Sequence, residues 1–328
     1  MSLFIKIHLS LQNKNFEVSF LMRVTARLIR LTVKALCESM DVETMVVIIK
    51  KLVPNYNLNQ RVGFAEVIPV PNRDAANQIV HDLKDMDFFL QFISLLTDIQ
   101  ENGLIGRKYK ISYLHLILEE IYKAGFIYDK KYRIFVEDPR IRKTRNWGFL
   151  REGHEYIFSF IYLDIVDNST LFSQYPIDII QATHIDLRNI VQYAIERRNG
   201  RIWSWEGDGG MGVFFFNNKE LNATLSCMEI IHELLIYNHT RSRLKRPMEL
   251  RIAVHTGSCV YMNDNEYINK SEIKKKLIEI ESKYCSPNTI TITQLVYSSL
   301  DHFITNQFQF IEKEGKSKMY NYKLKWEE

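Results

Sequence analysis

The second half of the chain alternates between short apolar runs and longer segments with apolar residues at helical spacing. Residues 156–163 form an apolar run typical of a buried strand, and residues 176–198 show helical periodicity up to an Asn-Gly stop. A hairpin, a helix at 220–238 and a strand at 248–255 follow. This order of strand, helix, hairpin, helix and strand predicts an α+β fold, with a ferredoxin-like α/β sandwich in its C-terminal part.

The last elements of this half are shorter. We predict a helix at 271–283, a strand at 288–293, a helix at 294–300 and strands at 308–312 and 319–326.

The first half has the pattern of a mainly helical domain. Helical spacing of apolar residues predicts helices within 20–52, 72–103 and 112–124. Shorter patterns predict a strand-like alternation at 1–12, an irregular strand at 61–70, a hairpin at 126–136 and a basic linker at 139–146. We therefore expect a helical regulatory or structural domain at 1–150 and a second domain, which carries the candidate chemistry, at 151–328.

Composition changes this picture little. The sequence is 46% hydrophobic, which indicates folded globular material, and its formal net charge of +4 is too small to imply a nucleic-acid partner. The four cysteines lack metal-ligand spacing and are typical of reduced thiols. No apolar run reaches membrane-spanning length, and the N-terminal residues lack the order of a signal peptide. We expect a soluble, cytoplasmic protein without a membrane partner.

The hairpin at 201–216, RIWSWEGDGGMGVFFF, carries the most informative acid. Glycines on both sides predict a sharp turn over residues 207–210 that leaves Asp208 at the tip. Asp164 ends the preceding apolar run, FSFIYLD, and this topology makes the run and the hairpin neighbours in one sheet. Two adjacent carboxylates repel unless a cation lies between them, and oxygen ligands suit Mg²⁺ or Mn²⁺. Taken alone, either acid fits an ordinary strand end or turn.

The turn after Asp164 adds a second candidate feature. It opens into a helix near Asn168 and Ser169, whose backbone N–H groups could contact phosphate. Two divalent cations beside such a turn could bind a nucleoside triphosphate and neutralise charge during attack at phosphorus.

Three motifs in chain order, LDIVDNS at 163–169, WEGDGG at 205–210 and LRIAVHTG at 250–257, resemble the class III adenylate and guanylate cyclases. The resemblance covers residues 158–322. It implies that Asp164 and Asp208 bind two Mn²⁺ or Mg²⁺ ions together with the backbone carbonyl of Ile165. It also implies a homodimer with sites at the interface, where the ribose 3′-OH attacks the α-phosphate to give a 3′,5′-cyclic nucleotide and pyrophosphate.

The sequence departs from this family at the position that recognises the purine base. Ser204 stands where purine cyclases carry a base-reading Lys or Glu, and it lacks their charge and reach. This combination is similar to the pyrimidine cyclases of the Pycsar antiphage systems, which signal to a separate effector. It implies UTP as substrate and cyclic UMP as product, in antiviral defence. Cytidylate and purine cyclases remain alternatives, as does a degenerate domain that binds nucleotide or a partner without turnover.

The helix after the third motif departs from the family as well. Lys275 and Glu279 align with the family's ribose-orienting Asn and transition-state Arg, and Glu279 adds negative charge where an arginine would neutralise it. Lys275, or its neighbours Lys274 and Lys276, could supply the missing positive charge, whereas most such runs are solvated helix faces. Asp167 replaces a glycine of the family and is either an added carboxylate near the metals or a helix cap.

Overall fold

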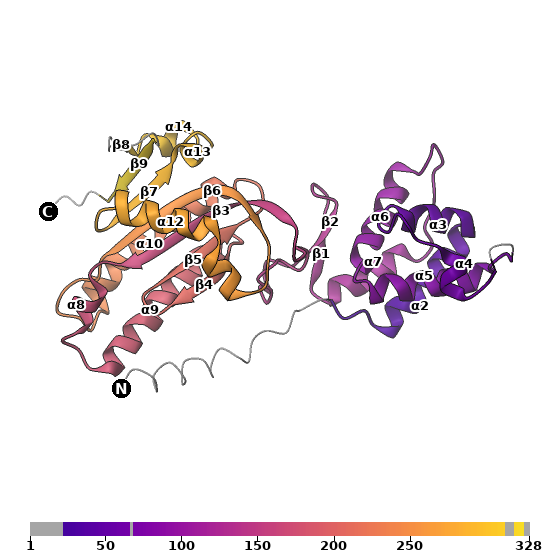
Figure 1. The fold of residues 1–328 in the computed structure, drawn as a ribbon, viewed down its shortest axis with the longest axis horizontal. Coiled ribbons are helices and arrows are strands. Elements are labelled where there is room, and N and C mark those ends of the chain that lie inside the picture. The colour runs from indigo at the N-terminus through magenta and orange to yellow at the C-terminus, as the bar shows by residue number, and fades with distance from the viewer. Residues whose placement is uncertain (1–21, 66–67, 312–317, 325–328) are drawn as a thin grey trace. The chain divides into compact units, whose positions relative to one another are not determined.

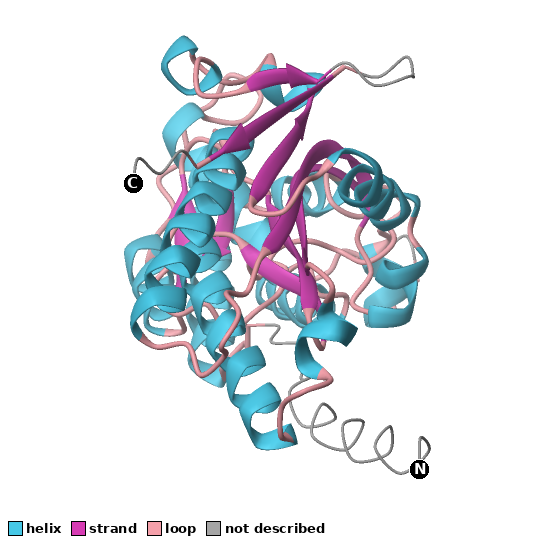
Figure 2. Cartoon of the chain, turned by 90° about the vertical axis from the view of Figure 1, so that its left-hand side faces the viewer, coloured by secondary structure: helices cyan, strands magenta, loops and turns pink. Residues whose placement is uncertain are grey.

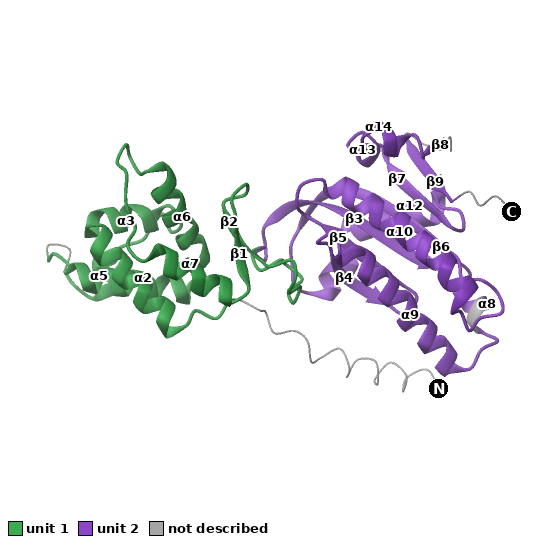
Figure 3. Ribbon diagram, turned by 180° about the vertical axis from the view of Figure 1, so that it is seen from behind, with its two compact units in different colours: residues 1–149 green, residues 150–328 purple. Residues whose placement is uncertain are grey.

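The computed structural model describes residues 22–65, 68–311 and 318–324 (Figure 1). The strand-like pattern at residues 1–12 lies outside this range. The chain divides into two compact units, Met1–Phe149 and Leu150–Glu328 (Figure 3). Each unit is described by itself below.

Unit 1 is built from short helices followed by a two-stranded hairpin. The helices are α2 (Ala26–Ser39), α3 (Val42–Lys50), α4 (Leu58–Val62), α5 (Asn72–Asp85), α6 (Phe89–Asn102) and α7 (Leu114–Lys123). The hairpin pairs β1 (Phe126–Asp129) with β2 (Ile134–Glu137) in antiparallel register, as the sequence pattern predicts.

Two predictions for unit 1 need correction, and one open choice is decided. The pattern at 20–52 fits one long helix or two shorter ones, and the structure has two, because Met40 is extended and the Asp41 carboxylate caps α3 by accepting the Thr44 N–H at 2.7 Å. Residues 72–103 also contain two helices, since Asp87 has a left-handed φ of 60° between them. The irregular strand predicted at 61–70 is wrong for its first residues, which form the end of α4.

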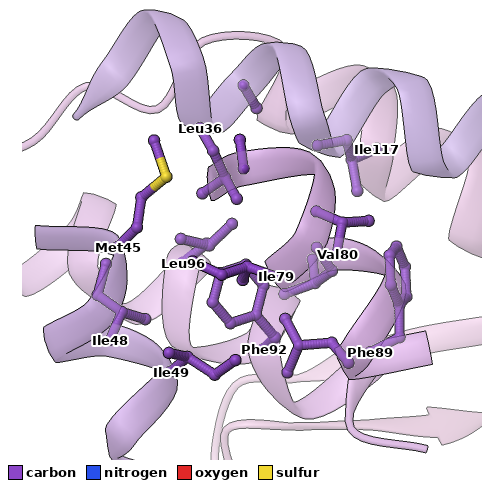
Figure 4. Packing of buried hydrophobic residues seen from close by; sticks show 14 of the residues in the cluster. Leu36, Met45, Ile48, Ile49, Ile79, Val80, Phe89, Phe92, Leu96 and Ile117 are labelled. Atoms are coloured by element: carbon purple, nitrogen blue, oxygen red, sulfur yellow. The ribbon is translucent and has the colours of Figure 1, made fainter. Parts of the chain in front are cut away.

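Five helices of unit 1 share one apolar core (Figure 4). Leu36 from α2, Met45 from α3, Ile79 from α5, Phe92 from α6 and Ile117 from α7 are all completely buried. The amphipathic stripes that predicted these helices therefore face a common centre, and their burial is the main source of stability in this unit.

Unit 2 is a seven-stranded sheet with the order β4-β5-β3-β6-β7-β9-β8. Its strands are β3 (Glu155–Ile165), β4 (Arg201–Glu206), β5 (Gly209–Phe214), β6 (Leu250–Val260), β7 (Thr289–Thr293), β8 (Gln309–Ile311) and β9 (Met319–Lys323). Its helices are α8 (Asn168–Phe172), α9 (Ile177–Glu196), α10 (Lys219–Thr240), α11 (Asn265–Lys270), α12 (Glu272–Tyr284), α13 (Gln294–Tyr297) and α14 (His302–Thr305).

The first four strands of this sheet have the order of a ferredoxin-like sandwich. All neighbouring pairs are antiparallel except β6 and β7, which are parallel. This arrangement confirms the predicted α+β class and the strand, helix, hairpin, helix, strand order of the core.

Helices pack on both faces of the sheet (Figure 2). Leu163 on β3 and Ile252 on β6 belong to a buried core with α9 and α10. Successive residues of a strand point to opposite faces, so Asp164 and its register partner Arg251 lie on the other face. Helix α12 packs on that face, since its Glu281 forms an ion pair with Arg251. The polar site is therefore separated from the main apolar core by the sheet itself.

The central hairpin is tighter than predicted. Glu206 pairs with Gly209, which leaves a two-residue turn of Gly207 and Asp208, while Gly209 and Gly210 belong to β5. Gly207 has a φ of +57°, a conformation that suits glycine at the first position of such a turn. Helices α11 and α14 are too short to leave a periodic pattern and were not predicted, whereas α8 begins where a helix is expected after the Asp164 turn.

Gly209 allows β5 to approach β3 beside Asp164. A Cβ atom at this position would lie 2.4 Å from the backbone carbonyl oxygen of Leu163. We expect Gly209→Ala to destabilise unit 2 by about 1–3 kcal/mol, because strand backbone has to move. The measurement is thermal unfolding followed by circular dichroism.

Gly207→Ala is the matched control, since a Cβ atom on this residue would have no neighbour within 4 Å and only left-handed strain is added. The Gly209 variant is expected to lose more stability than the Gly207 variant. An equal or smaller loss would contradict the close approach of β3 and β5.

Candidate active site

Asp164 and Asp208 come together at one end of the sheet. Asp164 is the penultimate residue of β3, and the pairing of Leu163 with Gly210 brings the hairpin tip beside it. A Cβ atom on Gly209, next to Asp208, would lie 3.0 Å from Asp164 Oδ1. Burial raises the pKa of the Asp164 carboxyl, and the nearby Asp208 carboxylate raises it further. The two acids therefore act as one electrostatic unit.

Arg251 partly offsets this negative charge. It is the direct register partner of Asp164, and its Nη2 lies 3.5 Å from Asp164 Oδ2. Its Nε forms an ion pair with Glu281 of α12. Burial and Asp208 together raise the pKa of Asp164 by more than the guanidinium lowers it.

Asn168 fixes the position of the Asp208 carboxylate through a hydrogen bond. Its amide Nδ2 donates a hydrogen bond to Asp208 Oδ2, so a side chain on α8 fixes the carboxylate at the hairpin tip. The opposite amide oxygen, Asn168 Oδ1, is buried and has no hydrogen-bond partner among the described residues. A buried carbonyl oxygen without a partner is costly, and a cation or its bound water would satisfy it.

The donor set fits a hard divalent cation but does not complete its shell. Two carboxylates and a buried amide oxygen are oxygen ligands of the kind that Mg²⁺ and Mn²⁺ accept. In the part of the chain that the structure describes, no group of three or more His, Cys, Asp or Glu side chains could hold a metal ion. Backbone or substrate oxygens would have to supply the remaining ligands.

Tyr162 and Ser204 lie in the next row of the same sheet. Tyr162 pairs with Met211, which pairs in turn with Ser204, so all three share one face. Burial raises the pKa of the Tyr162 hydroxyl, with smaller contributions from carboxylates that include Asp164 and Asp208. Ser204 is only 7% exposed, and its hydroxyl has no hydrogen-bond partner within the described residues. A hydroxyl that can both donate and accept a hydrogen bond is thus buried on the face of the sheet that carries Asp164.

The three lysines at the start of α12 have different environments. Lys274 is buried, and its ammonium donates to Asn269 Oδ1 at 2.7 Å and to Glu206 Oε1 at 3.2 Å, beside the hairpin tip. Lys275, the predicted catalytic lysine, is 63% exposed and contacts Glu272 on its own helix at 2.6 Å. Of the two, only Lys274 contacts the hairpin within a single chain.

Three other predicted positions, Glu279, Asp167 and Ser169, are exposed or are paired within α12. Glu279 is paired with Lys276 and Lys283 along α12, at 2.9 and 3.0 Å. Asp167 is exposed and precedes α8 with a left-handed φ of 51°, and its side chain makes no capping hydrogen bond. Ser169 is an exposed residue of the first turn of α8.

Several site residues escaped the sequence analysis. Arg251, Glu281 and Glu206 contact the site residues through strand register or from α12, and Glu281 lies outside all three motifs. His184 lies on α9, where burial lowers its pKa and the nearby Asp208 carboxylate raises it by a smaller amount. Arg251 and Glu206 left a usable signal, because they stand in the third and second motifs, on strands of the predicted sheet.

Burial of the Asp164 charge has a consequence for stability. A carboxyl whose pKa is raised by folding destabilises the folded protein once the pH exceeds its unfolded pKa, and acidification relieves this cost. We expect Asp164→Asn to raise the Tm at about pH 7.5 in EDTA, where the native carboxyl carries its charge. This gain should shrink as the pH falls and the native carboxyl becomes protonated.

The measurement is thermal unfolding of both proteins from neutral to acidic pH. Glu272→Gln serves as the control, because its side chain is 87% exposed and paired with Lys275 on its own helix. A lower Tm for Asp164→Asn at neutral pH would mean that Arg251 compensates the charge fully.

Solved nucleotide cyclase domains are similar to this chain. The guanylyl cyclase domain of the RhoGC fusion protein from the aquatic fungus Blastocladiella emersonii matches 52% of this chain and 97% of its own, with 17% identity and a TM-score of 0.42. The guanylyl cyclase Cya2 matches 52% and 93%, with 16% identity and a TM-score of 0.44. The adenylyl cyclase CyaB from P. aeruginosa matches 51% and 94%, with 14% identity and a TM-score of 0.43.

Other comparisons add no assignment. No protein-family profile and no curated protein matches the sequence. Within the described residues, none of the helices is both long and apolar enough to span a membrane. At these identities and TM-scores the solved structures carry no functional conclusion, which has to come from the chain's own site.

Proposed function

We propose that the protein is a nucleotide cyclase that converts UTP to 3′,5′-cyclic UMP and pyrophosphate with two divalent cations. The observation that supports this most is the side-by-side placement of Asp164 and Asp208, whose negative charges repel each other in a half-buried site. An acid pair kept together at such an electrostatic cost is expected where a cation binds.

The residues of the chain have separate tasks in this proposal. Asp164, Asp208 and the carbonyl of Ile165 hold the cations, and Asn168 orients the Asp208 carboxylate. When bound, Mn²⁺ or Mg²⁺ supplies positive charge that neutralises the triphosphate and the developing transition state. The backbone of Asn168 and Ser169 binds phosphate.

Lys275 is the proposed cation at the transition state, and it acts across a homodimer interface. Its exposed ammonium is available to a second chain, whereas the buried Lys274 is committed to Glu206 and Asn269. The sites therefore lie between two copies of the chain, as the sequence resemblance implies.

The choice of UTP rests on the buried hydroxyl of Ser204, which has no partner among the described residues. A serine hydroxyl can donate to or accept from a pyrimidine edge, but it is too short to replace the long charged reader of a purine. The product would act in the cytoplasm as a second messenger in antiviral defence, through a separate effector that binds the cyclic nucleotide. Unit 1 is proposed to be regulatory or structural.

A degenerate domain that binds nucleotide without turnover is the competing proposal. It is favoured by Glu279, which occupies the position of the family's arginine and is paired with lysines of its own helix. The acid pair favours the active enzyme, because turnover needs the cations that two neighbouring half-buried carboxylates would hold.

A turnover assay tests the proposed reaction. Purified protein is incubated with UTP, CTP, ATP or GTP and Mn²⁺, and the products are resolved by mass spectrometry. We expect cyclic UMP from UTP, and we expect Asp208→Asn to lower kcat by about two orders of magnitude or more, because the cations lose a charged ligand. Cyclic AMP or GMP as the main product would overturn the assignment of Ser204.

Ligand binding provides a readout without turnover. Mn²⁺ with a non-hydrolysable UTP analogue is expected to raise the Tm of the native protein by mass action, and Asp164→Ala is expected to abolish this shift. A shift without product would support the degenerate domain, and a shift that persists in Asp164→Ala would refute the metal assignment.

The lysines provide a further prediction with a built-in comparison. We expect Lys275→Gln to lower kcat while the Tm stays unchanged, because its ammonium is exposed and serves the transition state. Lys274→Gln is expected to lower the Tm, since it leaves the hairpin and α12 without their shared ion pair. An unchanged kcat for Lys275→Gln would remove it from the catalytic set.

A further inference from the structure

The charge on Arg251 is divided between two carboxylates from different elements. Its Nη2 lies 3.5 Å from Asp164 Oδ2 on β3, at the edge of ion-pair range, while its Nε contacts Glu281 Oε1 on α12 directly. The guanidinium is therefore shared between an ion pair with Glu281 through Nε and a long hydrogen bond from Nη2 to Asp164.

Glu281 is an unusual residue for its position. It is only 4% exposed, and it lies in the last turn of α12, where the helix dipole disfavours negative charge. Burial raises the pKa of its carboxyl, Arg251 lowers it, and Asp164 raises it again. A buried ion pair is a weak source of stability, so its net contribution to folding does not explain an acid at this place.

The position of Arg251 relative to Asp164 matters for a cation. A guanidinium paired closely with Asp164 would occupy the carboxylate oxygens and repel a divalent ion. A guanidinium drawn toward Glu281 leaves those oxygens accessible and still offsets part of the repulsion between Asp164 and Asp208.

We propose that Glu281 is a positioning residue that withholds Arg251 from Asp164 and thereby sets the affinity of the acid pair for divalent cations. This inference rests on the proposed metal-dependent function. Glu281 touches neither substrate nor cation and acts only through Arg251. Helix α12 thus sets the cation affinity of a site whose ligands lie on β3 and on the β4–β5 hairpin.

The two partners of the ion pair have opposite effects on metal affinity. Glu281→Gln leaves Arg251 without its anchor, so the guanidinium moves to Asp164 and Mn²⁺ binding weakens by about tenfold. Arg251→Gln removes the competing positive charge, so Mn²⁺ binding tightens by about tenfold. A purely structural ion pair would give losses of affinity in both variants.

The experiment measures the Kd of Mn²⁺ for the full chain by electron paramagnetic resonance of the free ion, without nucleotide. Asp164→Asn reports first on the metal site itself: if the native protein binds no Mn²⁺, or binds it equally well after this change, the proposed function fails. If Asp164→Asn abolishes binding but the Glu281 and Arg251 variants shift the Kd in the same direction, only the role of Glu281 fails.

Arg251→Lys is the conservative variant for the case that Arg251→Gln does not fold. It keeps the charge but cannot contact both carboxylates as a guanidinium does, so its Kd is expected to lie between those of the native protein and Arg251→Gln. The Lys276→Gln variant is a matched control on α12, because its ammonium pairs with Glu279. A change in Kd in this control as large as that in Glu281→Gln would overturn the proposal.

Discussion

The repulsion between two carboxylates at the end of the sheet is the constraint on which the site depends. Asp164 and Asp208 are brought together by backbone pairing, because Gly209 lacks the side chain that would separate β3 from β5, and Asn168 fixes the Asp208 carboxylate. Folding therefore imposes an electrostatic cost, which a single arginine only partly offsets. The cation proposed to bind between the acids would offset this cost.

Helix α12 connects this site to the rest of unit 2. Near its start, Lys274 contacts the hairpin residue Glu206, and near its end, Glu281 contacts Arg251. Both contacts lie on the face of the sheet opposite the core formed with α9 and α10. A run of three lysines serves two purposes, since the helical turn of about 100° per residue buries Lys274 and exposes Lys275.

The placement of positive charge also distinguishes the proposed active cyclase from the proposed degenerate domain. An active cyclase needs positive charge at the transition state, and two described cations of this face, Arg251 and Lys274, are already paired with carboxylates. An exposed cation from a second chain resolves this shortage, which is why the proposed homodimer and the proposed role of Lys275 depend on each other. A degenerate domain would have no such requirement.

The sequence by itself determined the α+β class, the order of the central strands and helices, and the proximity of the two aspartates. Hydrophobic periodicity, turn glycines and motifs are local signals that the sequence carries directly. It did not determine where a long periodic segment divides into two helices, because a single residue in the left-handed conformation, such as Asp87, is enough to end one helix. Only the tertiary structure decided the partners of the acids. Arg251 and Glu281 meet Asp164 through strand register and helix docking, and contacts between residues so distant in the chain leave no spacing in the sequence.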